Sequence, residues 1–185
     1  MSKTYFTSDW HLNEDRIGID GKPNLFYRPF DSTITQNYAI IANFVEKFED
    51  GDTLYHLGDV FYNKDSSHYN YSPVLKEKFP NSKFHLIIGN YDEKILEFLS
   101  PYFDTMQNDA WITLKDKEYY LNHYPVNCRD KQFSITGHIH GLWKVQKNMI
   151  NVGVDAWHFN PVSEDEIDFC RTACEKYYDQ NVFPY

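Results

Sequence analysis

The sequence predicts a single α/β domain in which helices cover central β-sheets. Strand-like and helix-like segments alternate through the first half of the chain, and the second half is rich in strand-like segments. The length of 185 residues suits one domain with a core of ordinary size. No internal repeat or low-complexity stretch interrupts the pattern, so one domain over residues 1–185 is expected.

The first half of the chain predicts three strands that alternate with three helices. Apolar residues spaced three and four apart predict a helix that ends at Gly51. Short apolar runs bounded by glycine predict buried strands. In order, the predicted elements are a strand at 5–8, a helix at 34–51, a strand at 53–57, a short helix opening at Ser72-Pro73, a strand at 84–88 and a helix at 92–99.

The second half of the chain predicts mainly strands. Two β-prone runs, 111–114 and 118–122, flank a polar turn at 115–117 and predict a hairpin. Residues 133–136 and 144–146 continue in the same manner. Ser163, followed by acidic residues, is then expected to cap a last helix that reaches about Tyr178.

Composition and charge exclude several classes of protein. The net charge of −9 argues against a general nucleic-acid binder, because phosphate backbones are held by Lys and Arg. No apolar run approaches the about 18 residues of a membrane helix, and the N-terminus lacks the pattern of a signal peptide. The three cysteines are expected to be reduced thiols. A cytoplasmic location is therefore expected, in the host cytoplasm if the chain is phage-encoded.

Polar residues suited to a divalent metal follow several of the predicted strands, where open α/β sheets place their ligands. Glycines precede three of these residues, which lets the backbone turn sharply or come close to an ion. His138 and His140 alternate with Ile139, so both imidazoles should point to the same side of an extended segment. The residues concerned are Asp9, His11, Asp59, Asn90, His123, His138 and His140.

Each of these motifs has a structural alternative when it is taken singly. Gly-Asp and Gly-Asn are common turn dipeptides, and Asp9 could cap a helix. The paired imidazoles and the joint appearance of the motifs at strand ends favour a site. The four remaining histidines lack such partners and are interpreted as structural or exposed: His56, His68, His85 and His158.

The motifs, in this order, resemble those of the calcineurin-like metallophosphoesterase superfamily. The stretches Arg28-Pro29-Phe30 and 151–155 are similar to its small bacterial and phage members, so the likeness reaches most of the chain. The resemblance implies a four-layer α/β/β/α sandwich, with two central sheets and helices outside. The motifs that carry it are Asp9-x-His11, Gly58-Asp59, Gly89-Asn90-x-Asp92, His123 and Gly137-His138-x-His140.

The resemblance also implies two divalent ions and a hydrolytic reaction. Asp59 would bridge the ions, and a hydroxide shared between them would attack phosphorus in line. Oxygen and imidazole ligands without thiolate favour Mn²⁺, with Fe, Zn²⁺ or Ni²⁺ as alternatives. The implied ligands are Asp9, His11, Asp59 and His140 for one ion, and Asp59, Asn90, His123 and His138 for the other.

Tyr91 departs from the family pattern, which has His at this place as the group that contacts the phosphate and protonates the leaving group. A phenol gives up its proton less readily than an imidazolium, so proton donation should be weakened. Asn90, Tyr91 and Asp92 are expected to act in catalysis with Asp59, and Asn90 and Tyr91 to contact substrate. Because position 91 has no His for Asp92 to orient, Asp92 is expected either to act in catalysis or to cap the next helix. Arg28 is either a phosphate clamp or a structural ion-pair partner.

Two functions from different classes follow from these residues. The first is a hydrolase of phosphomonoesters or phosphodiesters, with nucleotides among the candidate substrates. The second is a non-catalytic interaction scaffold of the same fold, in which Tyr91 marks the loss of activity. Two loops, 17–30 and 63–71, are expected to shape the mouth of the site. The sequence selects neither the substrate nor the oligomeric state.

Overall fold

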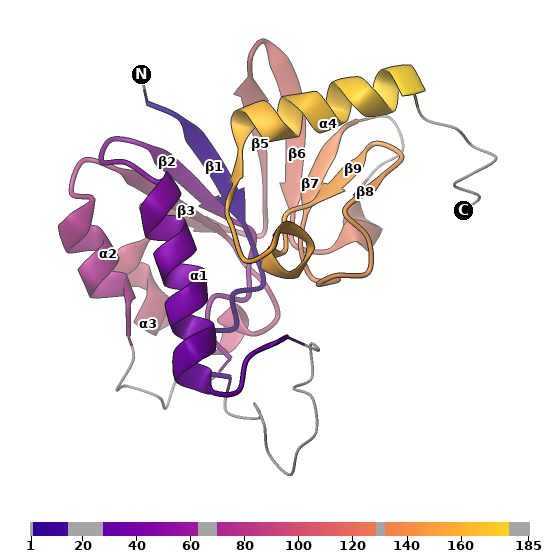
Figure 1. The fold of residues 1–185 in the computed structure, drawn as a ribbon. Coiled ribbons are helices and arrows are strands. Elements are labelled where there is room, and N and C mark those ends of the chain that lie inside the picture. The colour runs from indigo at the N-terminus through magenta and orange to yellow at the C-terminus, as the bar shows by residue number, and fades with distance from the viewer. Residues whose placement is uncertain (1, 15–27, 63–69, 129–131, 178–185) are drawn as a thin grey trace.

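Two five-stranded sheets lie at the centre of the computed structural model, which describes residues 2–14, 28–62, 70–128 and 132–177 (Figure 1). In the first sheet β1 to β4 are parallel and β10 is antiparallel to β1. Its order is β10 (Val162–Ser163), β1 (Thr4–Thr7), β2 (Thr53–His56), β3 (Lys83–Ile87) and β4 (Thr105–Gln107).

The second sheet combines an antiparallel hairpin with parallel pairs. Strands β6, β7 and β9 are parallel, while β5 and β8 run antiparallel to their neighbours. Its order is β5 (Asp109–Leu114), β6 (Lys117–Asn122), β7 (Ser134–Thr136), β9 (Met149–Asn151) and β8 (Val145–Gln146).

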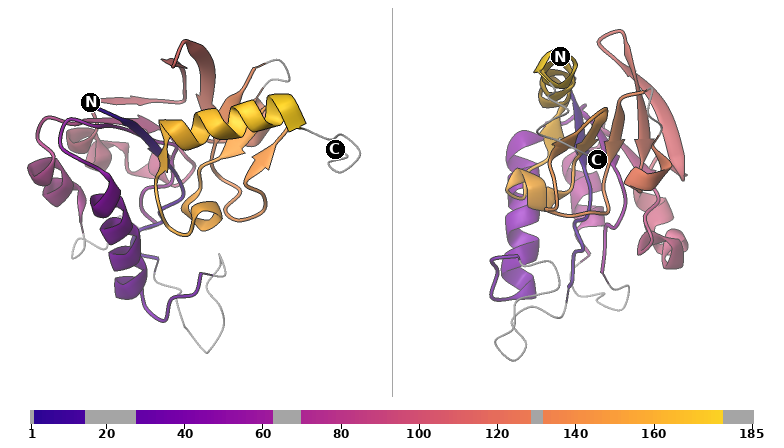
Figure 2. Two further views of the ribbon diagram at one scale, coloured as in Figure 1. Left: turned by 45° about the horizontal axis from the view of Figure 1, so that its top comes forward. Right: turned by 90° about the vertical axis from the view of Figure 1, so that its right-hand side faces the viewer.

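Helices flank both sheets, as predicted. Helices α1 (Thr33–Lys47), α2 (Ser72–Lys78) and α3 (Leu96–Leu99) pack on the first sheet through one buried apolar cluster. A second cluster joins the two sheets and includes Ile167 of α4 (Glu164–Tyr177). Helix α1 and strands β5 and β6 lie on opposite sides of the molecule (Figure 2). The predicted α/β architecture in one domain is confirmed.

Short 3-10 segments connect several of these elements. They are η3 (Asp92–Lys94), η4 (Ser100–Tyr102), η5 (Pro125–Asn127) and η6 (Val154–Trp157). Segment η3 and helix α3 replace the single helix predicted at 92–99. Ile95 leaves helical geometry with φ −133° and buries its side chain in the first cluster, which divides the segment in two.

Other predicted boundaries differ for similar reasons. Helix α1 ends at Lys47 and not at Gly51, because Phe48 turns to extended backbone and is buried against the first sheet. Strands β4, β9 and β10 were not predicted, since two or three residues show no strand period unless they lie in a longer β-prone run, as β7 and β8 do at 133–136 and 144–146. Residues 17–27 and 63–69 of the two predicted mouth loops, including His68, lie outside the described residues.

Local chemistry explains two of the correctly predicted features. Lys115 and Asp116 both have positive φ, 48° and 63°, which suits the tight two-residue turn of the β5–β6 hairpin. At the start of α4, the Ser163 hydroxyl accepts from the Glu166 N–H, and the Glu166 carboxylate accepts from the Ser163 N–H. This reciprocal pair is the predicted cap.

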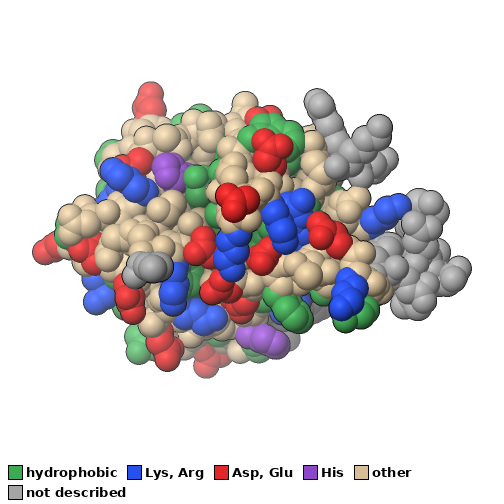
Figure 3. Space-filling view, turned by 90° about the horizontal axis from the view of Figure 1, so that it is seen from above, with side chains coloured by type: hydrophobic (Ala, Val, Ile, Leu, Met, Phe, Trp, Pro, Cys, Tyr) green, Lys and Arg blue, Asp and Glu red, His purple; other side chains and the backbone are tan. Residues whose placement is uncertain are grey.

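The face over α4 carries acidic and basic side chains intermixed (Figure 3). Ion pairs join this helix to the β5–β6 hairpin, among them Lys115 with Asp165 and Lys117 with Asp168. Basic side chains therefore do not gather into a patch among the described residues of this face. None of the helices in the described ranges is long and apolar enough to cross a membrane.

His56 in β2 is buried and should make the fold sensitive to acid. Its ring packs edge-on against Trp10, and neither ring nitrogen has a hydrogen-bond partner in the described part of the chain. Burial, with a smaller contribution from the nearby His123, lowers the pKa of His56 to about 3. The folded protein therefore keeps this imidazole neutral at a pH where the unfolded chain protonates it.

We expect His56→Phe to flatten the acid side of the stability profile. As pH falls from about 6.5 towards 3, the unfolded state gains a proton at position 56 that the folded state lacks, so stability is lost by up to about 1.4 kcal/mol per pH unit. Urea unfolding at pH 7 and pH 5 measures this difference, with His158→Asn as the exposed control. Equal losses in wild type and His56→Phe would contradict the assignment.

Candidate metal centre

The residues predicted from strand ends converge where the carboxyl ends of the two sheets meet. Asp9 follows β1, Asp59 follows β2 and Asn90 follows β3, all in the first sheet. His123 follows β6, and His138 with His140 follow β7, in the second sheet. Parallel strands end at the same edge, which is why segments far apart in sequence reach one place.

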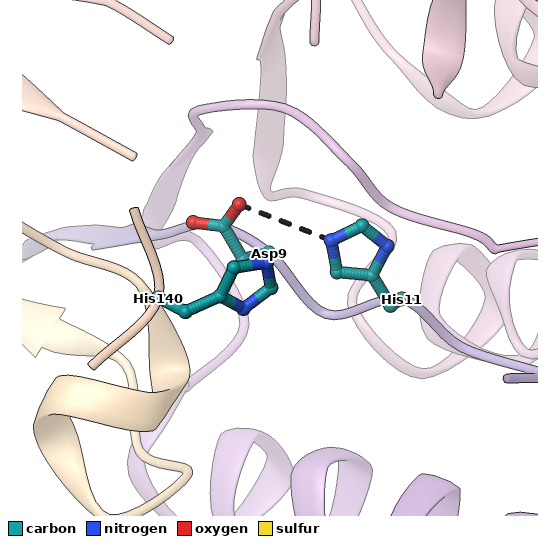
Figure 4. Close-up of side chains that lie close together, drawn as sticks. All are labelled: Asp9, His11 and His140. Carbon is teal, nitrogen blue, oxygen red and sulfur yellow. Dashed lines mark ion pairs between the residues drawn. The ribbon is translucent and has the colours of Figure 1, made fainter. Parts of the chain in front are cut away.

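The first group of ligand atoms comes from Asp9, His11 and His140 (Figure 4). One oxygen or nitrogen of each lies within 4.8 Å of the others. His11 Nε2 is 4.0 Å from Asp9 Oδ1, and the His11 and His140 rings stack with centroids 5.1 Å apart. Asp9 and His11 are fully buried.

The second group comes from Asp59, His123 and His138, again with one ligand atom of each within 4.8 Å of the others. Asp59 Oδ2 lies 3.5 Å from His123 Nε2 and also 3.5 Å from His11 Nε2 of the first group. Asn90 Oδ1 is 3.3 Å from His123 Nε2. Asp59 thus stands between the two groups, and all seven predicted metal ligands come together.

Glycine is required where the strands turn into this site. Gly58 has φ +92°, and a Cβ there would lie 2.5 Å from His123 Nδ1 and 2.7 Å from the backbone nitrogen of Gly89. A Cβ on Gly89 would lie 2.3 Å from Asp59 Oδ1. The close approach of His123 to the turn after β2 therefore requires glycine at position 58, and the side chain of Asp59 requires glycine at position 89.

The backbone is left-handed at five of the seven predicted ligands. The φ angles are 57° at Asp9, 44° at His11, 60° at Asp59, 74° at His138 and 50° at His140. The expectation that His138 and His140 share one side of an extended segment is therefore wrong. They lie in a turn, and one faces each group. Such a concentration of strained residues is typical of functional sites.

The donor set fits borderline divalent ions. His123 Nδ1 donates to the carbonyl oxygen of Leu57 at 2.6 Å, and His140 Nδ1 donates to Asp155 Oδ2 at 2.8 Å. These bonds place a proton on Nδ1, so Nε2 is the nitrogen that would face a metal ion, as in metal-bound histidine. Two carboxylates, an amide oxygen and imidazoles without thiolate suit Mn²⁺, Fe or Zn²⁺.

The electrostatics of the site reflect buried carboxylates at close range. Burial raises the pKa of Asp9, with a further rise from Asp59 that nearby histidines oppose. Burial alone would lower the pKa of His123, but a hydrogen bond to Asp59 and the charges of Asp9 and Asp59 raise it to about 9. The raised pKa values of Asp9 and His123 favour their protonated forms, and a metal ion bound at these residues would displace the protons.

Asp92 supports this site and does not cap the following segment. Its buried carboxylate accepts from the backbone N–H groups of Asp59 at 2.7 Å, Val60 at 3.0 Å and Gly89 at 2.9 Å. Burial and the charge of Asp59 raise the pKa of Asp92 to about 7, against the effect of these hydrogen bonds. The capping alternative is wrong, because the carboxylate instead ties the turn after β2 to the turn after β3.

Arg28 is a structural ion-pair partner and does not fit the role of a phosphate clamp. It is 4% exposed, and its guanidinium pairs with Asp155 through Nε at 2.8 Å. Sequence reasoning missed the role of Asp155, although the stretch 151–155 stood out as family-like. Asn151 in the same stretch donates to the His140 carbonyl oxygen at 2.6 Å and so holds the turn that carries His138 and His140.

Tyr91 lies beside the first group. Its ring packs edge-on against His11 with centroids 4.7 Å apart and also contacts Tyr62. The Tyr91 N–H donates to Asp59 Oδ1 at 2.9 Å. Asn13 exchanges hydrogen bonds with Asn37 of α1, and Asn122 accepts a hydrogen bond from the Tyr124 N–H.

Comparison with known proteins agrees with this geometry. The model of the calcineurin-like phosphoesterase superfamily domain matches residues 3–166. The chain belongs to the calcineurin-like phosphoesterase superfamily. The family consists of phosphoesterases, which supports a hydrolase, and the predicted family membership is confirmed.

Relatives of this phosphoesterase-family chain include proteins of unknown function. It is 27% identical over 176 residues to an uncharacterized protein of Methanocaldococcus jannaschii, covering 90% of each chain. A protein of unknown function from Aquifex aeolicus has a similar crystal structure, with TM-score 0.68, 26% identity, and coverage of 91% of this chain and 99% of that one.

A third likeness concerns the phosphoesterase fold alone. The crystal structure of the Pseudomonas putida nuclease MPE matches with TM-score 0.51 and 16% identity, covering 74% of this chain and 60% of the nuclease. The two-sheet architecture of this family member is therefore shared with a known nuclease.

Proposed function

We propose that this chain hydrolyses phosphate esters with the help of two divalent ions. The observation that carries the proposal is the position of Asp59, whose Oδ2 lies 3.5 Å from an imidazole nitrogen of each ligand group. Only a carboxylate among these side chains can bridge two cations and offset their charge. A carboxylate buried at this depth is costly unless positive charge lies close to it.

The two groups of ligands would each hold one ion. Asp9, His11 and His140 would hold one ion, and Asn90, His123 and His138 the other, with Asp59 shared. When bound, two such ions activate water as a nucleophile and withdraw charge from the phosphoryl oxygens. Mn²⁺ is the proposed resident ion, with Fe, Zn²⁺ or Ni²⁺ as alternatives.

Contacts to the substrate would come from Asn90 and Tyr91, which lie at the centre and are partly exposed. We place Asp92 as a positioning residue behind them, since among the described residues its carboxylate accepts hydrogen bonds from backbone N–H groups. Phosphomonoesters and phosphodiesters, nucleotides among them, are the proposed substrates.

The direct test is hydrolysis of p-nitrophenyl phosphate and bis(p-nitrophenyl) phosphate by Mn²⁺-loaded protein, with chelator-treated protein as control. Cleavage of either ester that disappears with chelator and returns with Mn²⁺ supports the proposal, and the pair separates monoesterase from diesterase. Metal binding without hydrolysis would favour the interaction scaffold. Failure to retain any metal, by elemental analysis after loading, would overturn the proposal.

Tyr91→His is expected to change the leaving-group preference. A histidine at position 91 can protonate a poor leaving group, whereas p-nitrophenolate departs without that help. The variant should therefore gain up to about 10²–10⁴-fold on alkyl phosphodiesters and much less on p-nitrophenyl esters. The ratio of the two kcat/KM values measures this gain.

Tyr91→Phe is the matched control for that experiment. It keeps the packing against His11 and removes only the hydroxyl group. Unchanged activity of Tyr91→Phe would show that the tyrosine only packs. An unchanged ratio in Tyr91→His would contradict the predicted preference for good leaving groups.

A further inference from the structure

Asp155 links His140, a candidate metal ligand, to the buried guanidinium of Arg28. It lies in η6, and its side chain is 8% exposed. Its Oδ2 accepts from His140 Nδ1 at 2.8 Å and from an Arg28 terminal nitrogen at 2.9 Å. Its Oδ1 accepts from Arg28 Nε at 2.8 Å. Both carboxylate oxygens are therefore directed by their hydrogen bonds.

Arg28 also holds the segment that carries the other two members of the first group. Its guanidinium donates to the carbonyl oxygen of Trp10 at 2.7 Å and to that of Asp9. These carbonyls belong to the left-handed turn that presents Asp9 and His11. One buried guanidinium thus contacts the Asp9–His11 turn directly and reaches His140 through Asp155.

The second group rests on different supports. His123 is oriented by the Leu57 carbonyl, and the backbone of Asp59 is held by Asp92. The hydrogen bonds that Arg28 and Asp155 make among the described residues go to the first group's segments. The support from Arg28 and Asp155 is therefore particular to the first group, although bonds such as that from the His11 N–H to the Asp59 carbonyl oxygen link the two groups directly.

We propose that Asp155 and Arg28 are positioning residues for the first ion site, formed by Asp9, His11 and His140. Asp155 fixes the His140 ring with Nε2 towards the ion, and Arg28 fixes Asp155 relative to the Asp9–His11 turn. The inference rests on the proposed function, because it concerns one of the two ions invoked there. A carboxylate behind a metal-bound imidazole orients the ring and increases its basicity.

The effect should appear in metal affinity, measured by titrating metal-free protein with Mn²⁺ and following free Mn²⁺ by electron paramagnetic resonance. Asp155→Asn should weaken the first site by about 10–100-fold, as losing such a partner typically does, and leave the second site unchanged. Asp168→Asn, which removes a surface carboxylate paired with Lys117, is the matched control and should change neither affinity.

Two variant backgrounds allow the Mn²⁺ affinities of the two sites to be measured separately. His138→Ala should retain only the first site, and adding Asp155→Asn there should show the full loss of affinity. His140→Ala should retain only the second site, and adding Asp155→Asn there should have no further effect, because the residue through which Asp155 acts is gone. An equal loss in both backgrounds would mean a general structural role and would overturn the inference.

A second variant covers the case in which Asp155→Asn does not fold. Asp155→Glu keeps the charge opposite Arg28 but displaces the carboxylate from His140, so it should also weaken the first site selectively. Unchanged affinity of both sites in that variant would overturn the positioning role while leaving the proposed function intact. A wild-type protein that binds no Mn²⁺ would instead overturn the proposed function, and this inference with it.

Discussion

Asp59→Asn should lower kcat on bis(p-nitrophenyl) phosphate by at least about 10³-fold. An amide offers one neutral oxygen where the bridging carboxylate offers two charged ones, so both ions would lose a shared ligand. Charge stabilisation by bound ions contributes several kcal/mol to such reactions, and about 4 kcal/mol corresponds to about 10³-fold in rate. Steady-state kinetics and the Mn²⁺ content of the variant measure the change together.

Asp50→Asn provides a control for that substitution. Asp50 is an exposed carboxylate that bonds to Asn81, and it lies in the turn before β2. It should leave both activity and metal content unchanged. Retention of more than about a tenth of wild-type kcat by Asp59→Asn would rule out a bridging role for this carboxylate.

Arg28→Met should cause the largest loss of stability. The guanidinium is buried, and its removal takes one donor from the Asp155 carboxylate and from each of the carbonyls of Asp9 and Trp10. Breaking a buried ion pair by removing one partner typically costs about 3–5 kcal/mol. For a chain of this size that corresponds to a fall in Tm of about 6–20 °C.

Thermal unfolding followed by circular dichroism, with and without Mn²⁺, measures this loss. Lys115→Met is the comparison, because it breaks a solvent-exposed ion pair with Asp165 and should leave Tm nearly unchanged. A similar small shift in both variants would show that the buried pair contributes little to the stability of the fold.

Sequence reasoning located the candidate ligands because their signal is local. A buried strand followed by glycine and a polar residue can be recognised within a few positions, and the strands after which Asp59 and Asn90 stand could be predicted in this way. Parallel strands then bring such residues to one edge without further information. The resemblance to the family added which of these residues would share each ion.

The supports of the site could not be predicted because their partners are distant in sequence. Arg28 and Asp155 are separated by 127 positions, and nothing near either residue indicates the other. Asp92 resembled a helix cap because a helical segment begins there, yet its three donors are Asp59 and Val60 in the turn after β2 and Gly89 upstream in its own turn. Strands of two residues, such as β10, exist only through pairing with a neighbour.

The left-handed backbone at five of the predicted ligands also lowers the stability of the fold. Each such residue costs about 1–3 kcal/mol relative to relaxed backbone, and glycine would remove most of that cost at a single step. In a fold that made no use of these side chains, nothing would offset that cost. Asp or His stands at every one of these positions, as expected if the left-handed backbone serves the proposed metal centre.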